Sequence, residues 1–298
     1  MTQFSSEEKR IISFFQRHEE YFCDLISRLY PLPEELLDRY KSFFNWRRIS
    51  NNEVIHWTEP FIEKYIDELD WCNLSENIKL PWSLTFLEKH ESRLWGEYYG
   101  DYFNEGWLSQ NEALPWSEEL IEKYEAKWNW QSLSIVSNIP WSIPLLEQYK
   151  QKWDWECLSH NPAILRDIQI CAKYHFYVWI VPQPNADWKF GLWTIDDIEK
   201  NKDTLSWMHL SASPTIKWTM EILIKYKDYW YWGDPDNRNC TCGLELFRNE
   251  HLPWSIELLE LFEDKWYYED LAYNDGVNEY LLPKLSPKLV ETILQLVT

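Results

Sequence analysis

The sequence predicts an all-α protein, an α-solenoid of about ten helical repeats that are each about 25 residues long. Three observations support this fold class. The 298 residues include 21 Trp but only 7 Gly, and so strong a bias indicates that one short motif recurs. The motif Leu/Ile-Pro-Trp-Ser returns at regular spacing, for example at Trp116 and Trp141, which are 25 residues apart. The apolar residues within each repeat follow the period of an amphipathic helix.

The tryptophan of this motif serves as the anchor from which the other positions of a repeat are counted. The anchors fall at Leu32, Trp57, Trp82, Trp116, Trp141, Arg166, Trp193, Trp218, Trp254 and Leu285. An atypical repeat is expected near Glu7, 25 residues before Leu32. Positions +12 and +14 are also rich in tryptophan, so we expect the tryptophans to be mainly architectural.

A helix is expected in the first half of each repeat. The residue after the anchor is Ser, Thr or Asp in every repeat from Thr58 to Ser286, and such a side chain caps the free amides of a first helical turn. The anchor and position +5, as in Trp116 with Ile121, have the spacing of a hydrophobic staple. Positions +4, +5, +8 and +12 span an arc of roughly 100° on a helix, so they form one apolar face.

The second half of each repeat, from +13 to +20, is too short for another long helix, and we expect a second short turn there. One repeat cannot bury its apolar face alone, whereas stacked repeats can. We therefore expect residues 1–298 to form a single repeat domain. Its N-terminal cap is expected at 1–31, its repeats at 32–272, and its C-terminal cap at 273–298.

The segment 174–194 departs from this pattern. Aromatic and β-branched residues flank a turn-forming sequence at Pro182–Asp187, which favours a small β-hairpin. A helical repeat with a two-residue insertion explains the same sequence, because Arg166 and Trp193 are only 27 residues apart.

Insertions interrupt the repeats near 95–106, 181–187, 233–243 and 274–279. Each comes late in its repeat, and insertions at an equivalent point of a solenoid emerge on one side, often the binding side. Tyrosines offer large contact areas, and carboxylates complement Lys or Arg, although tyrosines that fold back over neighbouring helices would explain the first insertion equally well. The candidate partner-binding residues are Tyr98, Tyr99, Asp101, Tyr102, Glu105, Asp234, Asp236, Asp275 and Glu279.

The charge balance points to the kind of partner. The chain carries 29 basic and 49 acidic side chains, a formal net charge of −20. This disfavours nucleic acid, because there is no excess of Lys and Arg to displace counterions from phosphates, and it fits a basic protein partner. No apolar stretch reaches the ~18 residues of a membrane span, and Met1–Arg10 lacks a signal-peptide core. We therefore expect a cytoplasmic protein without membrane association.

Catalytic signatures are poor, so we expect neither an enzyme nor a cofactor. There is no nucleophile elbow, Walker loop or dinucleotide fingerprint. His90 and Glu91 begin a zinc-helix motif, but Leu94 stands where the second histidine would be. His90 occupies the usual aromatic position of the repeat, so we expect it to be a packed core residue.

Two other groups of residues suggest metal ligands, and for both we favour a role without metal. Paired Cys-x-x-Cys elements are missing, although four residues could together form a zinc site. These residues are Cys171, His175, Cys240 and Cys242. A second group resembles the start of a calcium loop, but Arg238 replaces one oxygen ligand. Its members are Asp234, Asp236, Asn237 and Asn239.

Two consecutive repeats, 114–138 and 139–161, are of the form Leu/Ile-Pro-Trp-Ser, Leu-Ile/Leu-Glu-Lys/Gln-Tyr, Trp-x-Trp, Leu-Ser and Asn. In this form they resemble the tryptophan-rich repeats of uncharacterised bacterial proteins, and the resemblance extends from about Leu32 to Asn274. It implies the organisation of an interaction module.

The leading hypothesis is a non-catalytic, acidic, protein-binding solenoid. Its most concrete form is an immunity- or antitoxin-like inhibitor that binds and occludes a basic effector protein. Two alternatives stay open. One is a carbohydrate-binding module that uses aromatic and acidic surface residues, and the other is an enzyme with a cryptic carboxylate site.

Overall fold

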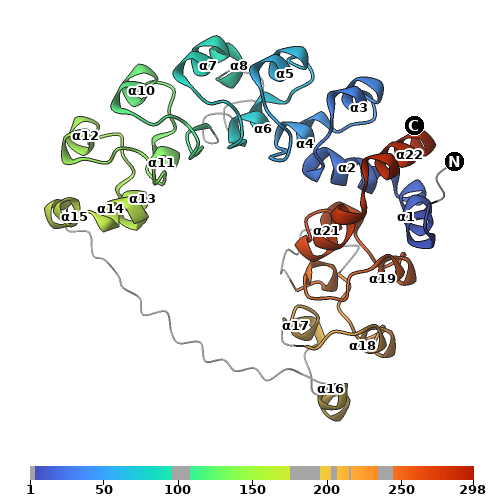
Figure 1. Cartoon of the computed structure of the whole chain (residues 1–298). Helices are drawn as coiled ribbons and strands as arrows, with labels where there is room; N and C mark the ends of the chain where they lie inside the picture. The colour runs from blue at the N-terminus through green and yellow to red at the C-terminus, as the bar shows by residue number, and fades with distance from the viewer. Residues whose placement is uncertain (1–3, 96–107, 175–194, 203–206, 215, 234–243) are drawn as a thin grey trace. The chain divides into compact units, whose positions relative to one another are not determined.

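A computed structural model describes residues 4–95, 108–174, 195–202, 207–214, 216–233 and 244–298. The prediction of an all-α protein is confirmed, since short helices joined by turns make up this part of the chain (Figure 1). The hairpin expected at 174–194 lies outside the described residues, apart from Tyr174, which ends a helix.

The chain divides into two compact units, and each is described by itself. The first compact unit comprises Met1–Ile26, Glu34–Phe44 and Gln183–Thr298, and the second comprises Ser27–Pro33 and Asn45–Pro182. The expectation of one domain over 1–298, with its caps and insertions, stays a prediction.

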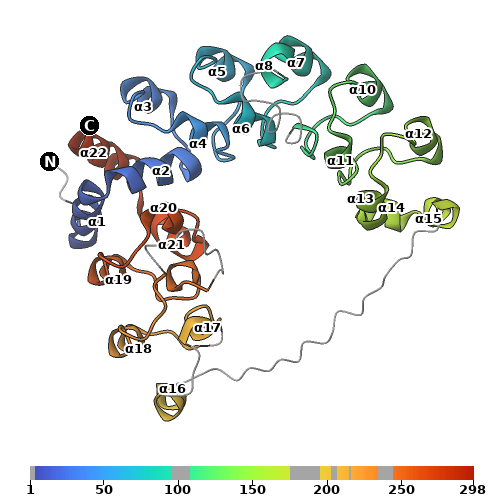
Figure 2. The same ribbon diagram turned by 180° about the vertical axis from the view of Figure 1, so that it is seen from behind.

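The helices of the second compact unit are short. In chain order they are α4 (Trp46–Ser50), α5 (Glu59–Lys64), α6 (Trp71–Glu76), α7 (Leu84–Lys89), α8 (Glu91–Leu94), α10 (Glu118–Lys123), α11 (Trp130–Leu133), α12 (Ile143–Gln148), α13 (Trp155–His160), α14 (Pro162–Arg166) and α15 (Ile168–Tyr174). Seen from either side, α5, α7, α10 and α12 follow one edge of this unit, and α6, α11 and α13 follow the other (Figures 1 and 2).

The first compact unit contains helices from both ends of the sequence. They are α1 (Ser6–Arg17), α2 (Glu19–Leu29, which ends within the second compact unit), α3 (Glu34–Arg39), α16 (Ile195–Asn201), α17 (Trp207–Ser211), α18 (Met220–Lys225), η2 (Leu246–Arg248), α19 (Ile256–Leu261), α20 (Tyr268–Leu271), α21 (Asp275–Leu281), η3 (Leu282–Lys284) and α22 (Pro287–Val297).

The residue after the anchor begins the first helix of a repeat, as predicted. The Ser83 hydroxyl accepts a hydrogen bond from the backbone N–H of Phe86 (3.0 Å), and Ser117 does the same for Leu120 (3.1 Å). Position +13 caps the second helix in the same way, because Asp70 accepts from the N–H of Asn73 (2.9 Å). The second short turn expected at +13 to +20 is therefore a capped short helix.

The first helix is shorter than the apolar pattern implies. In α10 the regular helix ends at Lys123, yet Tyr124 and Trp128 at positions +8 and +12 are both buried. Trp128 belongs to the turns that follow, and its indole N–H donates to the carbonyl oxygen of Ile121 (3.2 Å). The turn after α10 places Trp128 against this helix. Trp128 therefore extends the apolar face of α10 although it is not a helical residue.

Recurring polar residues join successive repeats. Asn77 at +20 donates from Nδ2 to the carbonyl oxygen of Ser50 in the preceding repeat (3.0 Å), and Asn161 donates likewise to that of Ser134 (3.0 Å). The Ser134 hydroxyl in turn accepts from the N–H of Asp154 in the following repeat (3.0 Å). Buried polar groups need such partners, so these residues serve the connection between repeats.

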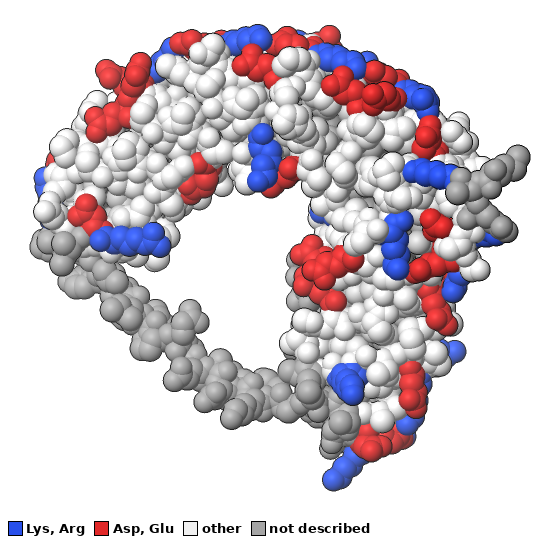
Figure 3. Space-filling model, in the orientation of Figure 1, with Lys and Arg blue, Asp and Glu red and all other residues white. Residues whose placement is uncertain are grey.

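Ion pairs also link neighbouring first helices. Glu at +6 faces Lys at +7 of the next repeat, as in Glu63 with Lys89 (2.9 Å) and Glu199 with Lys225 (3.0 Å). Charged side chains of both signs alternate along the edge formed by α5, α7 and α10 (Figure 3). Because these pairs are exposed, water and salt screen them and each adds little stability, but much of the charge on this edge is locally balanced.

The first and last described helices pack against each other within the first compact unit. Helix α1 contacts both α19 and α22. Arg10 pairs with Glu260 (2.5 Å), Arg17 pairs with Glu263 (2.8 Å), and the His18 ring stacks on Tyr268 with 4.1 Å between centroids. The N- and C-terminal segments that we predict as caps thus lie together.

Candidate interaction surface

Most of the predicted partner-binding residues fall outside the described part of the chain. These are Tyr98, Tyr99, Asp101, Tyr102, Glu105, Asp234 and Asp236. Asp275 and Glu279 lie within it, on α21, and both side chains are exposed. They are one helical turn apart, so they face the same side.

Gly276 explains how α21 can approach its neighbours so closely. A Cβ atom at this position would lie 2.2 Å from the carbonyl oxygen of Glu250 and 2.7 Å from Cδ1 of Trp254. The side chain of Asn274 caps the helix by accepting from the N–H of Val277 (3.1 Å). The segment 274–279, which we treat as an insertion, therefore forms a helix packed on the anchor Trp254.

The exposed positions on the second helices, and in the turns directly after them, differ in chemistry from repeat to repeat. Positions +15 and +19 are Gln131 and Ile135 in one repeat, and Glu156 and His160 in the next, and all four side chains are exposed. Ile135 is 46% exposed although it is apolar. Because the recurring Trp, Ser and Asn residues join the repeats, these variable positions are free to contact other molecules.

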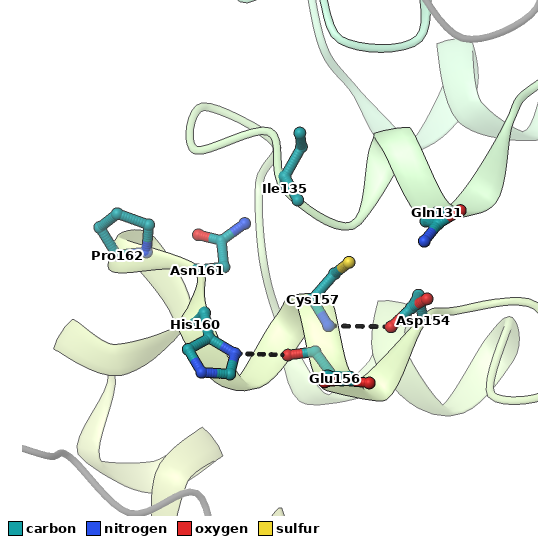
Figure 4. Close-up of a pocket in the computed structure, with 8 residues that line it drawn as sticks. All are labelled: Gln131, Ile135, Asp154, Glu156, Cys157, His160, Asn161 and Pro162. Carbon is teal, nitrogen blue, oxygen red and sulfur yellow. Dashed lines mark hydrogen bonds between the residues drawn. The ribbon is translucent and has the colours of Figure 1, made fainter. Parts of the chain in front are cut away.

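A groove lies between α11 and α13 in the second compact unit. Its volume is about 510 Å³. In Figure 4 the side chain of Cys157 points from α13 into the space toward Ile135 and Gln131. The groove is lined by Gln131, Ile135, Asp154, Glu156, Cys157, His160, Asn161 and Pro162.

The groove carries two carboxylates. Oδ1 of Asp154 accepts from the N–H of Cys157 (2.8 Å), and Nδ1 of His160 donates to the carbonyl oxygen of Glu156 (2.9 Å), as Figure 4 shows. Within the described residues, neither carboxylate forms an ion pair with Lys or Arg. Burial raises the pKa of the Cys157 thiol, and the negative charge of Asp154 raises it further. The thiol therefore stays protonated at neutral pH, which makes it a poor nucleophile.

His90 is placed as a core residue. It is 3% exposed and lies between the rings of Trp71 (4.9 Å) and Phe86 (4.6 Å). Nε2 of His90 is 3.5 Å from Oε1 of Glu63, which lies 27 residues earlier. The equivalent residue of another repeat, Tyr226, makes the same contact: its hydroxyl donates to Glu199, also 27 residues earlier (2.5 Å). Burial is the main cause that lowers the pKa of His90, so the ring is neutral and fills an aromatic position.

The proposed metal ligands are only partly described. Cys171 is buried, and its thiol donates to the carbonyl oxygen of Ile164 (3.4 Å). His175, Cys240 and Cys242 lie outside the described residues, as do Asp236, Asn237 and Asn239. Where side chains are described, no three His, Cys, Asp or Glu residues come together as metal ligands would.

No known protein family, curated protein or solved structure matches this chain. None of the described helices has the length and apolar character needed to span a bilayer. The resemblance to tryptophan-rich repeats stays a prediction.

The residues of the groove are absent from our predicted site. The sequence pattern predicts the binding surface in the insertions, whereas Gln131, Ile135, Glu156 and His160 belong to regular repeats. A signal was present in the aligned repeats, because positions +15 and +19 vary in chemistry while their neighbours recur. Variation at two exposed positions of an otherwise repeated unit indicates that packing does not determine the residue there.

Proposed function

We propose that this protein is a cytoplasmic α-solenoid that binds a basic protein and catalyses no reaction. Its most concrete form is an immunity- or antitoxin-like inhibitor that occludes a basic effector. One observation supports the proposal most directly. The residues that recur make the contacts between repeats, whereas the exposed residues differ from one repeat to the next.

The solenoid rests on hydrogen bonds that recur at the repeat spacing. The anchor indoles of Trp82, Trp116 and Trp141 each donate to the carbonyl oxygen five residues earlier, at 2.8, 3.0 and 3.0 Å. The Asn at +20 reaches back 27 residues in two separate repeats. A contact repeated with the same offset is what stacked, nearest-neighbour repeats produce.

The binding role rests on charge and on the exposed second helices. The net charge of −20 would raise the rate of encounter with a cationic protein. Asp275 and Glu279 on α21, and Glu156 beside the groove, present exposed carboxylates. Exposed apolar residues such as Ile135 and Tyr273 (48% exposed) supply the contact area that charges alone lack.

Removal of one complete repeat tests the solenoid. Deleting residues 116–140 joins Pro115 to Trp141 and restores the motif Leu-Pro-Trp-Ser. Lys152, which now pairs with Glu125 (2.6 Å), would meet Glu91, which now pairs with Lys127. We expect the variant to keep its mean residue ellipticity at 222 nm and to unfold cooperatively in urea.

The matched control removes residues 116–127 instead. This deletes α10, the first helix of the repeat, and leaves α11, the second helix of the same repeat, without its packing partner. We expect this shorter deletion to unfold the second compact unit. If both deletions lose their helical signal alike, neighbouring repeats are not interchangeable and the solenoid proposal fails.

Capture at two salt concentrations tests the function. The purified chain is immobilised and exposed to lysate of its source organism, and retained proteins are identified by mass spectrometry after washes at low and high salt. We expect one basic protein that high salt releases, because attraction between exposed charges is screened by salt. The purified pair is then mixed at equal concentrations, and an inhibitor should abolish the activity of its partner. Retention of no basic protein at low salt contradicts the proposal.

A further inference from the structure

The groove between α11 and α13 combines an apolar wall with negative charge. Ile135 stands exposed on the α11 side, and Glu156 and His160 are exposed on the α13 side. The thiol of Cys157 lies between them, half-buried and neutral. The groove has a volume of about 510 Å³. This is large enough for a long side chain, since ligand pockets begin at about 300 Å³.

The two carboxylates define the charge of a fitting group. Asp154 uses one oxygen to cap α13, and Glu156 makes no ion pair with Lys or Arg in the described part of the chain. Elsewhere in this compact unit, Glu63, Glu88 and Glu147 each face a lysine of the following repeat. The groove thus presents two carboxylates that a basic group from outside can pair.

We propose that this groove receives an arginine side chain of the basic protein partner, an inference that rests on the proposed function. The aliphatic part of the arginine lies along Ile135, and the guanidinium faces Glu156 and the outer oxygen of Asp154. Arginine fits better than lysine because its planar group is weakly hydrated and donates to two carboxylates at once. Its long stem also covers apolar surface while the charge stays accessible.

The α21 face is a weaker candidate for the same role. Asp275 and Glu279 are exposed on it, but the carboxylates stand on a helix surface without a cavity. An exposed pair of that kind gives little affinity. The α11–α13 groove combines its carboxylates with the apolar side chain of Ile135 and a hollow of about 510 Å³.

Cysteine alkylation locates the bound side chain. The full chain is mixed with a nona-arginine peptide at low ionic strength, and N-ethylmaleimide labelling of each cysteine is followed by peptide mass spectrometry. We expect the peptide to slow labelling of Cys157 at least threefold relative to Cys72. Cys72 is the internal control, because it is also half-buried on a second helix, α6, but lies outside the groove.

A matched pair of variants tests the carboxylate. Glu156→Gln should weaken nona-arginine binding, measured by fluorescence anisotropy, by about threefold to tenfold. Glu122→Gln removes the same charge from an exposed position on α10, and we expect less than a twofold change. Equal affinity loss in both variants would overturn the groove as the binding site.

The outcomes separate the two proposals. If the peptide binds but slows Cys157 and Cys72 equally, the groove proposal is wrong while binding of basic partners stands. If nona-lysine protects Cys157 as well as nona-arginine does, the preference for arginine is wrong. If neither peptide binds at low ionic strength, the groove proposal is wrong, whereas the proposed function is decided by the capture of a basic protein at low salt.

Discussion

Replacing Asn161 by Ala is expected to lower the free energy of unfolding by about 3–4 kcal/mol. Asn161 is 2% exposed. Its Nδ2 donates to the carbonyl oxygens of Ser134 and Val136 (3.0 Å each), and its Oδ1 accepts from the N–H of Ala163 (2.9 Å). Alanine would leave buried groups of two repeats without partners, and each such group costs about 1–3 kcal/mol.

Urea denaturation, monitored by circular dichroism, measures the effect. If the unfolding free energy depends on urea concentration with the same slope in variant and parent, both expose the same amount of surface on unfolding. Asn138→Ala is the matched control in the preceding repeat. Asn138 is exposed, so water can replace its hydrogen bond to Glu112 and the expected loss is within about 0.5 kcal/mol. Similar losses in both variants would mean that Asn161 does not hold the two repeats together.

Replacing Gly276 by Ala should destabilise the first compact unit by about 2–3 kcal/mol. On propensity alone, alanine inside a helix would gain about 1 kcal/mol over glycine. The added Cβ, however, would lie 2.2 Å from the carbonyl oxygen of Glu250 and 2.9 Å from Nε1 of Trp254. That indole also donates to the carbonyl oxygen of Asn249 (3.2 Å), so any shift disturbs the hydrogen bond at the anchor.

Thermal and urea unfolding of this variant is compared with Glu279→Ala on the same helix. Glu279 is exposed, so its replacement is expected to change stability by no more than about 0.5 kcal/mol. A Gly276→Ala variant as stable as the parent, or more stable, would show that α21 does not pack on Glu250 and Trp254.

Local structure follows closely from the amino-acid pattern. Caps such as Ser117 depend only on a hydroxyl placed before a helical turn, so spacing alone predicts them. The burial of Ile121 and Tyr124 follows in the same way from helical periodicity. The pattern failed at Trp128, where an apolar residue in phase with the helix belongs to a following turn.

The sequence pattern does not predict contacts between residues that are far apart in the sequence. Asn161 recurs at +20, but nothing in its spacing states that its partners are carbonyl oxygens 27 and 25 residues earlier. Gly276 lies in the segment 274–279, which the sequence pattern indicates as an insertion, and glycine marks loops more often than close helix contacts. The pattern does not predict the groove, because the groove forms between repeats and Ile135 and Glu156 line it together only once the repeats are stacked.

The packing of α1 on α19 and α22 has a consequence for synthesis of the chain. Arg10 cannot pair with Glu260 until the ribosome has added the 250 residues that separate them. At about 5–20 residues per second, this delay is about 10–50 s. During that time the apolar face of α1, with Ile11 and Phe14, lacks its final partners and is exposed to chaperones or aggregation. The second compact unit, from α4 to α15, needs no residue beyond Pro182, so it can fold while the first compact unit is still incomplete.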